Sequence, residues 1–121
     1  MSIKRILVVD DSPTELFLIA APLLAGGFEV ITASDGDEAL AKVSSERPDL
    51  ILLDVVLPKQ NGYQVCRALK RSPETSPIPV IMLTGKNQPS DRFWGLRQGA
   101  DDYLTKPFLP DALVGSVRRF L

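Results

Sequence analysis

Residues 50–54 read Leu50-Ile51-Leu52-Leu53-Asp54, four apolar residues in a row that end on an acid. Consecutive apolar residues suit a strand that is covered on both faces, as in a parallel sheet flanked by helices. Similar short runs occupy residues 6–9 and 80–83, a briefer one residues 103–105, and a less cleanly alternating one residues 29–33. The pattern therefore predicts five strands.

Segments with helical spacing of apolar residues lie between these runs. The first should stop at Gly26-Gly27, the second before Pro48 and the third before Ser72-Pro73, while a fourth covers residues 90–98 and a fifth residues 110–120. Strand and helix alternate five times, which calls for right-handed crossovers. We expect an α/β fold with a parallel sheet and helices on both faces.

The first helix carries both a start signal and a conflict. Ser12 before Pro13, with Glu15 three residues after Ser12, is typical of an N-cap with a capping box. Pro22 falls inside the helix, where it removes a backbone donor and crowds the carbonyl of Leu18, so we expect a kink or an early end. Glycines within the fourth and fifth helices are weaker conflicts of the same kind: Gly95 and Gly115.

Length and composition limit the possible functions. The 121 residues, 45% of them hydrophobic, suffice for one domain over residues 1–121 and leave no room for an output domain. A formal charge of −1, from 14 basic and 15 acidic residues, argues against a nucleic-acid partner. No run approaches the roughly 18 apolar residues of a membrane span. We therefore expect no membrane insertion.

Histidine and cysteine usage narrows the chemistry. The chain has no histidine, which excludes histidine metal ligands and a histidine general base. Its single cysteine, Cys66, cannot form an internal disulfide and is interpreted as a small core residue. The apolar stretch after Lys4 and Arg5 is too short for a signal peptide. A reducing, cytoplasmic location fits these features best.

The residues that follow the strands carry the candidate chemistry, because strand carboxyl ends form the ligand crevice in open α/β sheets. Asp10 and Asp11 follow the first strand and Asp54 the third. Thr84 follows the fourth strand and Lys106 the fifth. Three acids, a hydroxyl and an ammonium are thus expected at one edge.

Such an acidic cluster needs positive charge. At an effective dielectric constant near 20, two carboxylates ~4 Å apart repel by about 4 kcal/mol. Oxygen ligands with room for water suit Mg²⁺, and Lys106 can supply further positive charge. These groups match phosphoryl transfer, with Asp54 as a nucleophile that forms an acyl phosphate and Thr84 as a donor to a phosphoryl oxygen. A carboxylate is already ionised at neutral pH, so no general base is needed.

Four motifs in order resemble the receiver domains of bacterial two-component response regulators from end to end. They lie at residues 8–12, at residues 52–58 with 61–63, at residues 80–84 and at residues 99–108. The resemblance implies a flavodoxin-like, CheY-like sheet of strand order 2-1-3-4-5.

The resemblance also implies roles for individual residues. Asp10 and Asp11 would hold Mg²⁺ together with Asp54 and the backbone carbonyl of Val56. The phosphoryl lifetime in this family varies with neighbours such as Val56 and Lys86.

A second set of implied roles concerns switching. Thr84 and Tyr103 would form the switch, with the hydroxyl moving toward the phosphoryl group while the ring turns inward. Lys106 would bind the phosphoryl group, and its bond to Pro107 would be cis.

The implied function is that of a stand-alone receiver rather than an enzyme. A histidine kinase would phosphorylate Asp54, and a target protein would bind the surface of the predicted fourth helix, fifth strand and fifth helix. Residues 11–15 and 93–100 resemble receivers of chemotaxis-like systems that control type IV pili, twitching or phototactic motility. A phosphate sink for a shared kinase and a flagellar-motor chemotaxis receiver are the alternatives.

Three further functions compete with this interpretation. A haloacid-type phosphatase would need a second acid two residues after the nucleophile, where Val56 stands. A flavodoxin-like cofactor binder would need a phosphate-cradling loop where Asp10 and Asp11 stand. The third alternative is a degenerate receiver that never accepts phosphate and serves only as a docking module.

The sequence leaves two positions open for Trp94, which could pack in the core or lie in an interface.

Overall fold

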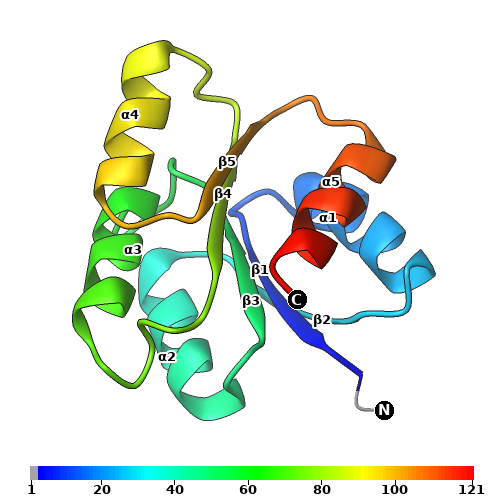
Figure 1. Cartoon of the computed structure of the whole chain (residues 1–121), viewed down its shortest axis with the longest axis horizontal. Coiled ribbons are helices and arrows are strands. Elements are labelled where there is room, and N and C mark those ends of the chain that lie inside the picture. The colour runs from blue at the N-terminus through cyan, green and yellow to red at the C-terminus, as the bar shows by residue number, and fades with distance from the viewer. Residues whose placement is uncertain (1–2) are drawn as a thin grey trace.

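Strands and helices alternate strictly along the chain in the computed structural model, which describes residues 3–121 (Figure 1). The elements in chain order are β1 (Arg5–Val9), α1 (Pro13–Ala25), β2 (Glu29–Ala33), α2 (Gly36–Glu46), β3 (Leu50–Leu53), α3 (Gly62–Arg71), β4 (Val80–Thr84), α4 (Pro89–Arg97), β5 (Asp102–Thr105) and α5 (Pro110–Arg119). Where the sequence predicted the end of a helix or strand, the observed end lies within one residue of it.

All five strands are parallel and lie in the order β2-β1-β3-β4-β5, so the predicted α/β fold and strand order are confirmed. The register pairs Val9 with Leu53, Leu53 with Met82, and Thr84 with Thr105. The carboxyl ends of β1, β3, β4 and β5 therefore meet at one edge of the sheet. This edge carries the candidate chemistry.

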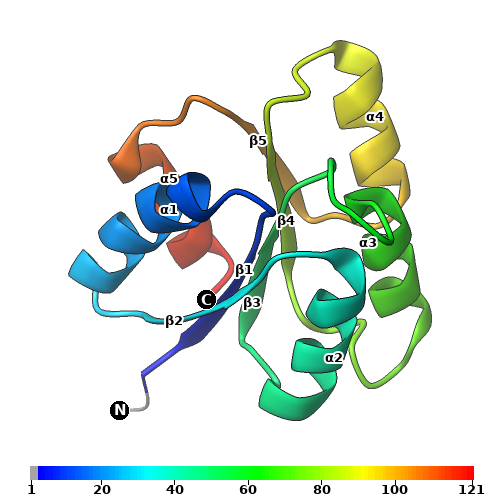
Figure 2. The same ribbon diagram turned by 180° about the vertical axis from the view of Figure 1, so that it is seen from behind.

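Helices cover both faces of the sheet, with α1 and α5 on one side and α2, α3 and α4 on the other (Figures 1 and 2). One core cluster joins alternate strand residues such as Ile6 and Leu52 to Ile19 of α1 and Leu113 of α5. The opposite cluster joins the intervening strand residues to α2 and α3: Leu7, Val9, Ile51, Leu53, Ala39, Val43, Val65, Cys66 and Leu69. Burial on both faces explains the consecutive apolar residues of the strands.

α4 packs differently from the other helices. Its only buried residue is Gly95. Three apolar side chains on its outer side, Phe93, Trp94 and Leu96, are exposed, and we call them the α4 aromatic face. Trp94 is 53% exposed and meets Phe93 edge to face at a centroid distance of 5.6 Å, so it is not a core residue.

α1 continues through Pro22 to Ala25, so the expected early end is wrong. Proline at this position removes one backbone donor, and the residue whose carbonyl loses its partner, Leu18, lies in an exposed position that water reaches. The helix then ends at Gly26, whose amide donates to the carbonyl of Pro22 at 3.0 Å. One missing hydrogen bond near a solvated helix end is evidently tolerated.

The N-terminus of α1 forms half of the expected capping box. The Ser12 side chain accepts a hydrogen bond from the amide of Glu15 at 3.3 Å, as predicted. The amide of Ser12, however, donates to Asp10 Oδ1 at 3.0 Å rather than to Glu15. The Glu15 carboxylate is therefore free to face Lys106 at 3.9 Å.

At the amino-terminal ends of β4 and β5, one lysine forms hydrogen bonds to several neighbouring segments. Lys70 Nζ at the end of α3 donates to the carbonyls of Ser76 and Ile78 and to Asp101 Oδ2, at 3.0, 2.8 and 3.1 Å. Asp101 Oδ2 also accepts the amide of Val80 at 2.8 Å. The starts of β4 and β5 are thus held to the end of α3.

Cys66 lies fully buried in α3, with its thiol donating to the carbonyl of Gln98 at 3.6 Å. Burial raises the pKa of this thiol from 9.0 to about 11. The folded state therefore holds the thiol proton more tightly, so the Cys66 contribution to stability is complete below pH 9 and is lost as the pH rises through about 11.

Among residues 3–121, no helix is long and apolar enough to cross a bilayer.

We expect native protein at pH 8 to react with iodoacetamide at least about 100-fold more slowly than unfolded protein, because only the exposed thiolate is nucleophilic. In urea titrations, the loss of unfolding free energy between pH 9 and 11 should be smaller for Cys66→Ala than for the wild type. Equal alkylation rates in the native and unfolded protein would contradict this prediction.

Candidate functional site

The site begins with two acids at the ends of neighbouring strands. Asp10 follows β1 and Asp54 follows β3. Their backbones continue the strand pairing, since the Asp54 amide donates to the carbonyl of Val9 and the Asp10 amide donates to the carbonyl of Ala33, both at 3.0 Å. The sheet itself therefore places both carboxyl groups at one edge.

Lys106 joins the two acids. Its ammonium lies 3.0 Å from Asp54 Oδ2 and also donates to Asp10 Oδ2. Both carboxyl groups are buried, but Asp54, at 8% exposed, is more accessible than Asp10, at 1%. Asp54 Oδ1 accepts a further hydrogen bond from the amide of Val56 at 3.1 Å. One ammonium thus serves two carboxylates from separate strands.

Burial and charge act against each other in this cluster. Desolvation raises the pKa of Asp10 above its ordinary value, despite the hydrogen bonds from Lys106 and Ser12 that favour the carboxylate. Desolvation alone would lower the pKa of Lys106, but its hydrogen bonds to Asp10 and Asp54 prevail and raise it. Lys106 is therefore a permanent cation near neutral pH, and it does not fully compensate the burial of Asp10.

The predicted metal ligands come only partly together. Among the described residues 3–121, no three acidic, cysteine or histidine side chains are grouped closely enough to hold an ion. Asp11 is exposed, and the side chain of Val56 is exposed beside the acceptor. The donor set nevertheless suits a hard divalent cation, since Asp10, Asp11 and Asp54 supply three carboxylates against the single ammonium of Lys106.

Lys86 connects the two predicted switch residues. Thr84, fully buried at the end of β4, accepts a hydrogen bond from the Lys86 amide at 3.4 Å. Tyr103 on β5 is 3% exposed, and its hydroxyl donates to the carbonyl of Lys86 at 2.7 Å. Burial raises the pKa of the Tyr103 phenol. The loop between β4 and α4 is thus held to both side chains.

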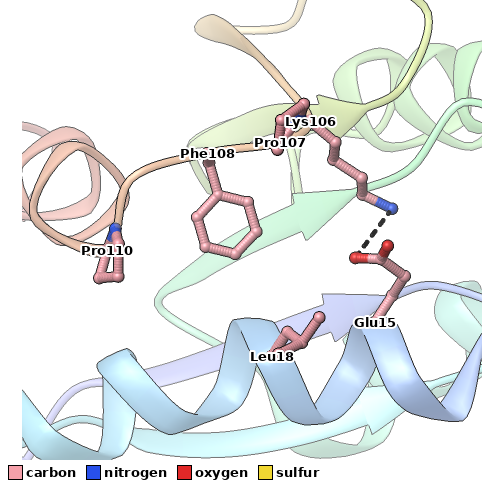
Figure 3. A pocket seen from close by; sticks show the side chains of 6 residues that line it. All are labelled: Glu15, Leu18, Lys106, Pro107, Phe108 and Pro110. Atoms are coloured by element: carbon pink, nitrogen blue, oxygen red, sulfur yellow. Dashed lines mark ion pairs between the residues drawn. The ribbon is translucent and has the colours of Figure 1, made fainter.

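A groove opens beside Lys106, between α1 and the segment that links β5 to α5 (Figure 3). It measures about 430 Å³ and is lined by Leu18, Phe108 and Pro110, with Glu15 and Lys106 facing each other at one end. The Lys106–Pro107 peptide bond is cis. The groove is connected to Asp54 through Lys106, which lines one end of it and binds the Asp54 carboxylate.

Sequence reasoning missed several residues that shape this site. Gly62 packs its backbone on the carbonyl of Asp54, and Tyr63 donates its hydroxyl to the carbonyl of Asp91 in α4 at 3.0 Å. Asn61 with Gln64 three residues later was a detectable signal for the start of α3, because this pair forms a capping box. The role of the Lys86 backbone left no signal, since a backbone carbonyl is independent of residue type.

Comparisons with known proteins agree with this architecture. The chain is 46% identical over 117 residues to Protein PilH of Pseudomonas aeruginosa, covering 97% of each chain. It is 48% identical over 118 residues to the alkaline phosphatase synthesis transcriptional regulatory protein PhoP of Bacillus subtilis, of which it spans only 48%. The structure superposes on the chemotaxis response regulator CheY4 of Vibrio cholerae with a TM-score of 0.92 at 35% identity, covering 99% of this chain and 100% of that one.

The response regulator receiver domain family matches residues 6–118, which is nearly the whole chain. Members of this family are phosphoacceptor switches that histidine kinases phosphorylate. Since the match includes all of the sheet except Arg5, together with the edge that bears Asp10, Asp54 and Lys106, the chain belongs to the response regulator receiver domain family.

Proposed function

We propose that this chain accepts one phosphoryl group on Asp54 from a histidine kinase, in a Mg²⁺-dependent reaction, and signals by binding another protein. The observation that carries the proposal is the position of Asp54. Its carboxylate lies 3.0 Å from the Lys106 ammonium, which also binds Asp10, and it is the more exposed of the two acids. Asp54 is therefore the member of this pair that an incoming phosphoryl group reaches more readily.

In the proposed reaction, a carboxylate oxygen of Asp54 bonds to the phosphorus of a phosphohistidine. The phosphorus–nitrogen bond breaks, and its electron pair returns to the donor imidazole. The Lys106 ammonium, already beside Asp54, neutralises the phosphoryl charge that arrives there, and the Thr84 hydroxyl donates to another phosphoryl oxygen. The chain thus contributes position and charge rather than a base.

Mg²⁺ would supply further neutralisation of the phosphoryl oxygens, held by Asp10, Asp11, Asp54 and the backbone carbonyl of Val56. The donor chemistry supports this assignment, since all four ligands are oxygens. The excess of carboxylates over the one ammonium also favours a divalent cation at this edge.

The proposed switch consists of Thr84 and Tyr103, which share Lys86 as a hydrogen-bonding partner. Movement of the Thr84 hydroxyl toward the phosphoryl group would release the amide of Lys86. The loop before α4 would then change, and with it the surface of α4.

The proposed output surface comprises α4, β5 and α5. The α4 aromatic face supports this assignment, because a cluster of exposed aromatic side chains is typical of protein interfaces. A positive charge lies within it, since the Arg97 guanidinium stands 5.6 Å from the centre of the Phe93 ring.

We further propose a role in type IV pilus or chemotaxis-like motility. The similarity to Protein PilH over 97% of each chain supports it. A strain that lacks this protein should then lose surface motility, and Asp54→Asn should fail to restore it. Restoration by Asp54→Asn would favour a docking module, whereas excess phosphorylation of a second receiver in the deletion strain would favour a phosphate sink.

Acetyl phosphate with Mg²⁺ should add the mass of one phosphoryl group to the intact wild-type protein, as an acid-stable and base-labile adduct. Asp54→Asn should take up none, because the amide is not a nucleophile at neutral pH. Asp111→Asn, which changes an exposed acid in the first turn of α5, is the matched control and should be labelled like the wild type. Equal labelling of Asp54→Asn would refute the assignment.

A further inference from the structure

Gly95 occupies an unexpected place in α4. Glycine is among the poorest residues in a helix interior. Gly95 is nevertheless the buried residue of α4. A second helix interior glycine, Gly115 of α5, has open space around it. The two glycines therefore differ in what surrounds them, although both weaken their helices.

The space beside Gly95 is filled by the ring of Tyr103. A Cβ atom added at residue 95 would lie 2.9 Å from both Cδ2 and Cε2 of that ring and 3.5 Å from Met82 Cγ. Real Cβ contacts of 2.9 Å essentially never occur, so an alanine methyl group at residue 95 would force the ring or the helix to shift. Tyr103 is 3% exposed in this position.

We propose that Gly95 is a positioning residue for the switch tyrosine. The absence of a side chain at residue 95 makes room for the buried ring of Tyr103. The size of residue 95 therefore sets the balance between the buried and the exposed positions of this ring. The part of this inference that concerns phosphorylation rests on the proposed function. The part that concerns the ring rests on the contacts of Gly95 alone.

The ring, rather than the helix, should give way when residue 95 is enlarged. α4 is held near its start by the Tyr63 hydroxyl, which donates to the carbonyl of Asp91 at 3.0 Å. Arg92 Nη1 donates to the backbone carbonyl of Tyr103 at 2.9 Å, and this bond does not depend on where the ring points. The ring itself has one hydrogen bond, to the Lys86 carbonyl, and can reach solvent through another staggered rotamer.

The position of the ring also bears on the site. Tyr103 holds the carbonyl of Lys86, while the amide of Lys86 donates to Thr84. An outward ring releases this loop and alters the surroundings of the Thr84 hydroxyl. If phosphorylation and the buried ring favour each other, an outward bias must weaken phosphoryl-analogue binding, at most by the factor that couples the two.

The direct test reads the ring through its own titration. The chain has two tyrosines, and in protein labelled with carbon-13 at tyrosine Cζ their two ring signals can be assigned with the help of Tyr63→Phe. In the otherwise wild-type protein, the Tyr103 signal should move to its phenolate position only well above the ordinary tyrosine pKa, because burial raises the pKa of Tyr103. Adding Gly95→Ala should return the titration toward about pH 10, and adding Gly115→Ala should leave it unchanged. An unchanged titration in Gly95→Ala would overturn the inference.

A second measurement concerns beryllofluoride, which mimics the phosphoryl group. In the presence of Mg²⁺, Gly95→Ala should weaken its binding at least about fivefold, within the usual range of coupling between sites. Gly115→Ala should stay within about twofold of the wild type. In a Tyr103→Leu background, which lacks the conflicting ring atoms, Gly95→Ala should change binding less than about twofold.

Each outcome separates the two proposals. If the wild type itself fails to bind beryllofluoride, the proposed function fails, and the titration still decides the role of Gly95. If Gly95→Ala does not fold, the double variant with Tyr103→Leu should fold, because the steric conflict is then absent. Failure of both variants to fold would refute the inference, since the conflict would then lie elsewhere.

Discussion

Gly62→Ala is expected to lower the free energy of unfolding by about 3 kcal/mol or more, at the upper end of what overpacking costs. An added Cβ atom would lie 2.2 Å from the carbonyl oxygen of Asp54 and 2.8 Å from the Cα atom of Val55. Both are backbone atoms of a tightly paired segment, and the Gly62 amide donates to the carbonyl of Val55 at 2.8 Å. A backbone cannot rotate aside as a side chain can.

Urea denaturation of Gly62→Ala and of Gly115→Ala would measure this effect. The control should be neutral or slightly stabilising, because its new methyl group meets open space and alanine is the better helix former. Any folded Gly62→Ala protein should also accept phosphate poorly, since Asp54 must move with its carbonyl. A loss below about 0.5 kcal/mol, the usual range for surface substitutions, would show that the loop adapts.

Lys106→Met is expected to cost about 3 kcal/mol in the absence of divalent cations, because removal of one partner leaves buried charges uncompensated. Asp10 and Asp54 both use this ammonium, and Asp10 is almost wholly buried. Mg²⁺ should therefore stabilise the variant more than it stabilises the wild type. The double variant with Asp10→Asn should recover much of the loss, since it removes one of the stranded charges.

The matched control is Lys86→Met. Lys86 forms a looser ion pair, 4.0 Å from Asp91, and its side chain is largely solvated. Its loss should cost no more than about 0.5 kcal/mol. Thermal unfolding of both variants, with and without Mg²⁺, provides the comparison, and a Lys106→Met protein as stable as Lys86→Met would contradict the proposed charge balance.

The sequence predicted the fold closely because local signals and global topology agree. The consecutive apolar residues at 50–53 could only be buried on both faces, and both core clusters use them in alternation. Pro22 was the exception, where local propensity predicted a kink or an early end, and tertiary packing overrode the early end. Burial of Ile19 and Leu23 on either side of the proline outweighs one missing hydrogen bond.

The site was predicted less completely than the fold. Strand ends correctly indicated that Asp10, Asp54 and Lys106 would meet, because parallel strands align their carboxyl ends. The sequence assigned Glu15 to helix capping alone. In the structure, the Ser12 amide donates to Asp10 instead of to Glu15, and the Glu15 carboxylate faces Lys106. The choice between two acceptors for one amide depends on distances of a few tenths of an ångström, which no spacing rule encodes.

The lysine at the end of α3 has a mechanical consequence for the switch. Lys70 binds two loop carbonyls and Asp101, and its side chain also packs against Gly99 just after α4. The trailing end of α4 is therefore anchored, while its leading end is held by two side-chain hydrogen bonds, from the Tyr63 hydroxyl to Asp91 and from Arg92 to the carbonyl of Tyr103. Any displacement of α4 should be a swing about its C-terminal end, so that amide hydrogen exchange is fastest in the first turn and slows toward the pivot.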